Sequence, residues 1–275
     1  MPSHRTAIVY DFDGTLAPGN IQELSFLPDL DVDKNDFWKE VGEQKRQHDA
    51  DEILVYMRLM LQRAKDKGVA VTKDALAAHG ASTPLFKGVE TWFERINAHA
   101  AGLDLALEHY VVSSGNEELI EGSPIARHFT HIYGSKFIFD DDGQAVWPGT
   151  SVNYTTKTQY LFRINKGIAN HWDRESINRF VPLNERPIPF TRMLYIGDGD
   201  TDIPSMKMVR HQGGFSIAVF DPGQWRTGAQ EKIHNLIAED RVHFVAPGDY
   251  SEGSQLEVIV KGILGRFALR AKERA

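Results

Sequence analysis

Four clusters of polar side chains in this sequence have residue types that could act together on a phosphate group. They are Asp11 with Asp13, Ser113, Lys157, and Asp198 with Asp202. Carboxylates that lie close together cannot all ionise at low cost without a cation, and an all-oxygen ligand set suits Mg²⁺. A lysine would add positive charge and a serine a hydroxyl donor, so that with the metal they would surround a dianionic phosphoryl group. The residue types therefore predict a magnesium-dependent phosphate site.

Short apolar segments place most of these clusters at the ends of expected strands. We expect strands at residues 7–10, 109–113, 192–196, 214–220 and 242–246, a hairpin at 137–147, and helices between them. Strands that alternate with helices form a parallel sheet covered on both faces, and such sheets bind ligands at the carboxyl ends of their strands. The sequence thus predicts an α/β fold, a Rossmann-like doubly wound parallel sheet, with the polar clusters at one edge.

Residues 18–84 have a different pattern. Asp33 has the side chain of a helix N-cap, apolar positions recur at helical spacing after Asp51, and Gly68 is a C-terminal stop signal. We expect a small all-helical cap domain at 18–84, inserted into a core domain made of residues 1–17 and 85–275. A cap that closes over a site excludes water and favours small substrates.

Composition excludes several other classes of protein. The 275 residues include no Cys, which removes thiolate chemistry and cysteine-ligated metals. Acidic residues outnumber basic ones by 38 to 31, a net charge of −7, and this balance disfavours nucleic-acid partners and binding to anionic membranes. No apolar run approaches the length of a membrane span, and we expect a cytoplasmic protein. The oligomeric state stays open.

The motifs Asp11-Phe-Asp-Gly-Thr-Leu16 and Gly197-Asp-Gly-Asp-Thr-Asp202, with a strand ending in Ser113 and a downstream Lys157, resemble the four motifs of the haloacid dehalogenase (HAD) superfamily of phosphohydrolases. The acidic hairpin before Lys157 is similar to the phosphoserine-phosphatase-like branch. The resemblance implies that Asp11 is the nucleophile and forms an aspartyl-phosphate, while Asp13 protonates the leaving alcohol and then activates water.

The resemblance also implies the remaining roles at the site. The phosphate-binding set comprises Thr15, Ser113, Ser114, Gly115 and Lys157, and the Mg²⁺ set comprises Asp11, Asp13, Asp198 and Asp202. Asp13 would contribute its backbone carbonyl, and Asp202 would act through water or from behind the direct ligands. Two assignments have competitors: Ser114 competes with Ser113, and Lys136 and Lys166 compete with Lys157.

The expected function is a Mg²⁺-dependent phosphatase acting on a small phosphorylated metabolite. Two alternatives stay open at this point. A phosphotransferase or phosphomutase would use the same aspartyl-phosphate intermediate but a different acceptor, and a non-catalytic module would use Asp11 as a phosphorylation switch. The sequence assigns no role to residues 165–191 or to the last 55 residues, and it does not identify the substrate.

Overall fold

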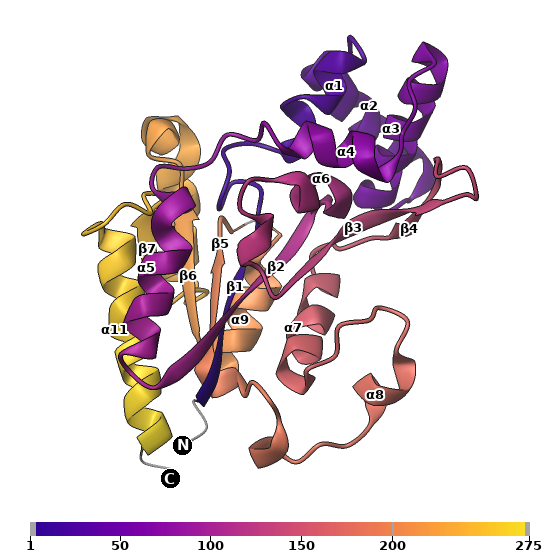
Figure 1. The fold of residues 1–275 in the computed structure, drawn as a ribbon. Helices are drawn as coiled ribbons and strands as arrows, with labels where there is room; N and C mark the ends of the chain where they lie inside the picture. The colour runs from indigo at the N-terminus through magenta and orange to yellow at the C-terminus, as the bar shows by residue number, and fades with distance from the viewer. Residues whose placement is uncertain (1–3, 200, 273–275) are drawn as a thin grey trace.

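The computed structural model describes residues 4–199 and 201–272, and these residues form one seven-stranded sheet with helices around it (Figure 1). The strands lie in the order β4-β3-β2-β1-β5-β6-β7. Their bounds are β1 His4–Tyr10, β2 Leu105–Asn116, β3 His131–Phe139, β4 Ala145–Thr150, β5 Met193–Gly197, β6 Phe215–Phe220 and β7 Phe244–Pro247. All neighbouring pairs are parallel except β3 and β4, which form the expected hairpin.

Both faces of the sheet are covered, as a doubly wound fold requires. Along β1 the side chains alternate: Ile8 and Tyr10 belong to one buried cluster, and Ala7 and Val9 to the other. Helices α5 (Val89–Ala101) and α11 (Gln255–Lys272) cover the first face, whereas α7 (Thr156–Lys166) and α9 (Ile203–His211) cover the second (Figure 1). The structure therefore confirms the predicted α/β fold class.

Residues 18–84 are helical and lie beyond the carboxyl ends of the strands (Figure 1). They form a short 3₁₀ turn η1 (Ile21–Glu23) and four helices: α1 Phe26–Asp29, α2 Lys34–His48, α3 Glu52–Lys67 and α4 Lys73–Gly80. Asp33 and Asp51 each accept two backbone N–H bonds as N-caps, and Gly68 ends α3 with a φ of 68°. The predicted N-cap at Asp33 and the predicted stop at Gly68 are thus confirmed.

Close backbone contacts attach this helical segment to the sheet. Helix α4 packs on α6 (Glu117–Gly122), where a Cβ added at Gly80 would lie only 1.9 Å from the carbonyl oxygen of Leu119. The Ala145 N–H of the hairpin donates to the carbonyl of Val71 at 2.7 Å. The site between the segment and the strand ends is therefore walled by both parts of the chain.

A glycine and an asparagine set the starts of two helices. Helix α5 begins at Val89, because Gly88 has a φ of 83° and packs against the backbone of Ser251, where a Cβ would be 2.3 Å from a backbone nitrogen. The helix after β2 begins at Glu117 with Asn116 as its N-cap, so Ser114 and Gly115 belong to the end of the strand. The start of α5 thus depends on a distant segment, whereas the start of α6 depends on a local cap.

The remaining helical elements are short and connect the strands. They are η2 Ala126–His128, α8 Arg174–Asn178, η3 Leu183–Glu185, η4 Phe190–Arg192, η5 Pro222–Gln224, the π-helical η6 Trp225–Ala229 and α10 Gln230–Ala238. Across residues 4–199 and 201–272, every helix is too short or too polar to span a bilayer.

Candidate active site

The first acidic cluster lies at the carboxyl end of the central strand. The Asp11 N–H donates to the carbonyl of Ile196 at 2.9 Å, which places Asp11 between the ends of β1 and β5. Gly14 then turns the chain with a φ of 72°, and a Cβ there would lie 2.9 Å from Oδ2 of Asp198. A glycine is therefore needed for this loop to approach the second acidic cluster.

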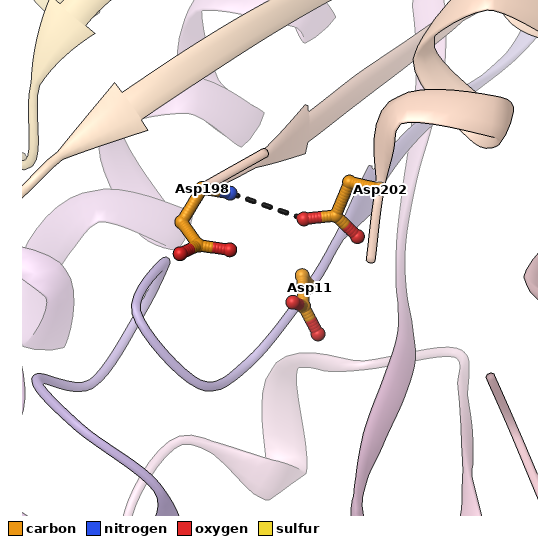
Figure 2. A group of neighbouring side chains, drawn as sticks. All are labelled: Asp11, Asp198 and Asp202. Carbon is orange, nitrogen blue, oxygen red and sulfur yellow. Dashed lines mark hydrogen bonds between the residues drawn. The ribbon is translucent and has the colours of Figure 1, made fainter. Parts of the chain in front are cut away.

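Asp11, Asp198 and Asp202 form a carboxylate triad at this edge. One oxygen of each lies within 4.8 Å of the others, and Figure 2 shows the three side chains gathered at the ends of two strands. The Asp198 N–H donates to Oδ2 of Asp202 at 3.1 Å, which orients Asp202 within the loop. Gly197 is required here as well, because a Cβ would lie 2.3 Å from the same oxygen. The sequence predicted that these three acids converge. Asp200, which lies between Asp198 and Asp202 in the sequence, is outside the described residues.

Lys157 supplies the buried positive charge of the site. Its Nζ lies 3.1 Å from Oδ2 of Asp11 and 2.7 Å from Oδ1 of Asp202, and the side chain is fully buried. The Tyr195 hydroxyl also donates to Oδ1 of Asp202, at 2.7 Å. Burial alone would raise the pKa of Asp202, but Lys157 and Tyr195 outweigh this effect and lower it. Asp202 is thus the member of the triad that is held ionised by its protein neighbours.

For Asp11 and Asp198, positive charges and hydrogen bonds do not offset the cost of burying an ionised carboxyl. Burial raises the pKa of Asp11 well above its usual value, and the charge of Asp202 raises it further. Burial and Asp202 likewise raise the pKa of Asp198, against the opposing effect of Lys232, whose Nζ lies 3.1 Å from Oδ2. A divalent cation would relieve this repulsion, and three carboxylates are the oxygen donors that Mg²⁺ prefers. The donor set therefore fits a Mg²⁺ ion.

Asp13 lies apart from the triad, beside the second strand. Its Oδ1 accepts the Ile21 N–H at 2.9 Å, and a Cβ added at Gly115 would lie 2.8 Å from its Oδ2. Burial raises the pKa of Asp13 to about 7, although the Ile21 N–H opposes the shift. A carboxyl with this pKa can hold and release a proton near neutral pH.

The predicted phosphate-binding residues divide into two groups. Ser113, Ser114 and Gly115 line the same cavity as Asp11, and the Ser113 Oγ accepts the Gly115 N–H at 3.1 Å. Thr15 and Lys157 are fully buried and do not line it. The Thr15 carbonyl accepts the Tyr250 hydroxyl at 2.7 Å, so this residue holds the loop against the C-terminal part of the chain.

The cavity has a volume of about 690 Å³ and extends from the carboxylates to the helical segment, where η1, α2 and α3 form its opposite wall. Tyr56 of α3 lines it and donates its hydroxyl to the Ser114 carbonyl at 2.8 Å.

Sequence reasoning missed Tyr195 and Lys232 as partners of the acids. Tyr195 stands in an apolar strand and Lys232 on an ordinary surface helix, so neither carried a local signal.

Comparison with known proteins agrees with this geometry. The family model of haloacid dehalogenase-like hydrolases matches residues 8–207, which is more than half of the chain, and the chain therefore belongs to this family of hydrolases. An uncharacterized protein of Borreliella burgdorferi is 29% identical over 278 residues, covering 91% of this chain and 93% of that protein.

Two solved structures show the same fold at low sequence identity. One is a HAD family hydrolase from Salmonella enterica serovar Typhi, with a TM-score of 0.57 and 15% identity over 96% of this chain and 72% of that one. The other is a substrate-bound phosphoserine phosphatase, with a TM-score of 0.55 and 15% identity over 94% of this chain and 98% of that one. The predicted family resemblance is confirmed, and phosphoserine phosphatases are among the structural neighbours.

Proposed function

We propose that this hydrolase is a Mg²⁺-dependent phosphatase that cleaves a small phosphomonoester through an aspartyl-phosphate on Asp11. The observation that carries the proposal is the position of Asp11, which lies within 4.8 Å of Asp198 and Asp202 and 3.1 Å from the Lys157 ammonium. Lys157, together with a Mg²⁺ ion held by the carboxylates, would place positive charge around the attacking Asp11 oxygen, where it would neutralise a phosphoryl dianion. The phosphoserine phosphatase neighbour, whose structure contains its substrate, supports a small phosphorylated substrate.

In the first step, an oxygen of Asp11 attacks phosphorus and forms a new P–O bond. The bond between phosphorus and the ester oxygen breaks, and its electron pair stays on that oxygen, which takes the proton of Asp13. The raised pKa of Asp13, about 7, supports its protonated form at neutral pH. In the second step, Asp13 accepts a proton from water, whose oxygen attacks the same phosphorus and releases Asp11 and inorganic phosphate.

The other residues hold the reacting groups in place. Asp11 and Asp198, with the Asp13 carbonyl, would hold Mg²⁺ directly, and Asp202 would support them through water or from behind; the ion would withdraw charge from the phosphoryl oxygens. Ser113 and the N–H groups of Ser114 and Gly115 would bind those oxygens from the β2 side. Lys157 and Thr15 do not line the cavity. Lys157 would act by holding Asp11, and Thr15 would act by fixing the loop that carries Asp13.

We also propose that residues 18–84 act as a cap domain over a core of residues 1–17 and 85–275. The cavity wall formed by η1, α2 and α3 supports this division, since these elements face the acids across the cavity. A wall of this kind restricts water and limits the size of the leaving group.

The test is hydrolysis of p-nitrophenyl phosphate with Mg²⁺, by the natural sequence and by Asp11→Asn. We expect Asp11→Asn to lower kcat by about a thousandfold or more, and EDTA to abolish activity reversibly. Asp33→Asn is the matched control, because asparagine caps a helix as well as aspartate does and residue 33 is outside the cavity. Full activity of a folded Asp11→Asn protein would refute the mechanism. Transfer of phosphate to an added alcohol in preference to water would instead show a phosphotransferase.

A further inference from the structure

Gln22 contributes a buried carboxamide to the cavity wall. The residue lies in η1, only 2% of its surface is exposed, and it lines the cavity that contains Asp11 and Asp13. Its Oε1 is buried and has no hydrogen-bond partner among the described residues. An acceptor buried without a partner is costly, so native proteins rarely keep one without a reason.

The other polar side chains that the segment 18–84 contributes to this wall all have partners. Asn20 and Trp38 donate to Glu23, Lys45 pairs with Glu52, and the Tyr56 hydroxyl donates to the Ser114 carbonyl. Gln22 is therefore distinguished from them by its unpaired acceptor. Because Gln22 lines the cavity, a molecule bound there would lie against its carboxamide.

The position of Gln22 relates it to one part of the proposed substrate. The preceding residue, Ile21, donates its N–H to Oδ1 of Asp13 at 2.9 Å. Asp13 is the residue that protonates the ester oxygen in the proposed mechanism, so this backbone contact places η1, and Gln22 with it, on the leaving-group side of the cavity. A donor on the carbon next to the ester carbon is the substrate group that could reach Oε1.

The surrounding wall is suited to a neutral leaving group. Trp38, Val41 and Ile53 provide apolar surface, and the two charged residues of the segment that line the cavity, Lys45 and Glu52, neutralise each other. A carboxamide recognises a hydroxyl without requiring a charge.

We propose that Gln22 is a substrate-recognition residue whose buried carboxamide oxygen accepts a hydrogen bond from a hydroxyl of the leaving group. The preferred substrates are then phosphomonoesters of neutral, hydroxylated alcohols with a hydroxyl next to the ester carbon. This inference rests on the proposed phosphatase function and extends it to the substrate class.

The test compares two esters that differ in hydroxyl groups, glycerol 3-phosphate and propyl phosphate. For the natural sequence, we expect kcat/KM to favour glycerol 3-phosphate by about tenfold or more, the value of one hydrogen bond in a binding site. Gln22→Met keeps the length of the side chain but removes the carboxamide, and it should bring the ratio to within about twofold of unity. Gln44→Met is the matched control, because Gln44 lies on α2 outside the cavity and pairs with Glu40 and Arg58.

A binding experiment separates this inference from the phosphatase mechanism. In the Asp11→Asn background, calorimetry should show that Gln22→Met weakens binding of glycerol 3-phosphate about tenfold and leaves propyl phosphate unchanged. A preference that survives Gln22→Met, or the absence of any preference, would overturn the role of Gln22. Faster turnover of phosphoserine than of glycerol 3-phosphate, unchanged by Gln22→Met, would also overturn it. That result would indicate that Lys45 and Glu52 separate and bind the charged groups of phosphoserine. Failure to hydrolyse any ester would refute the phosphatase proposal, while the binding comparison would still decide the role of Gln22.

Discussion

Replacing Lys157 with methionine should destabilise the metal-free protein at about pH 8 by about 3–5 kcal/mol, the usual cost of removing one partner from a buried ion pair. The ammonium is fully buried and lies 3.1 Å from Asp11 and 2.7 Å from Asp202. Without it, the crowded carboxylates lose their buried counter-charge. Lys136→Met is the matched control: Lys136 pairs with Glu117 at 3.1 Å but is 32% exposed, so its loss should cost about 1 kcal/mol or less.

The pH dependence of this deficit makes the prediction specific. Lys157 helps to lower the pKa of Asp202, and in the variant burial would instead raise that pKa above its value in the unfolded chain. The folded variant then binds a proton that the unfolded chain does not, so it gains stability as the pH falls. The deficit relative to the natural sequence should shrink by about 1.4 kcal/mol for each pH unit over which one such proton is bound. Urea unfolding in EDTA at about pH 8 and about pH 5 measures it. A deficit equal at both pH values, or no larger than that of Lys136→Met, would refute the reasoning.

Two further substitutions test other contacts. Gly115→Ala would place a Cβ 2.8 Å from Oδ2 of Asp13, so we expect kcat for p-nitrophenyl phosphate to fall about tenfold or more. Unchanged turnover would show that the position of Asp13 is not critical. Burial lowers the pKa of His109 from 6.5 to about 3. The unfolded chain therefore binds a proton that the folded protein does not. The contribution of neutral His109 to folding stability is fully present above about pH 6.5 and is lost as the pH falls toward 3. His109→Gln should remove about 1.4 kcal/mol per pH unit of this slope in urea unfolding between those values, and an unchanged slope would contradict the assignment.

The parts of the molecule that were predictable from the sequence are those fixed by local patterns. The apolar segments before Asp11 and Asp198 predicted strands, and Asp33 and Gly68 predicted helix ends, because caps and buried strands depend mainly on neighbouring residues. The start of α5 could not be predicted in this way, since the positive φ of Gly88 depends on a segment more than 150 residues away. The unpaired acceptor of Gln22 could not be predicted either, because pairing is a property of the folded surroundings.

The position of the site follows from the order of the strands. The chain places β2, β3 and β4 on one side of β1 and then returns to place β5, β6 and β7 on the other. At such a reversal the connections leaving the neighbouring strands diverge, which opens a crevice at the carboxyl ends. Asp11 follows β1 and Asp198 follows β5, on the two strands where the order reverses, so their carboxylates must meet in that crevice. Lys157, on α7, contacts Asp11 and Asp202 from the face of the sheet that α7 covers. Residues from three distant parts of the sequence thus converge because the topology opens a crevice at this edge of the sheet, and the helical segment that follows β1 lies beyond the same strand ends.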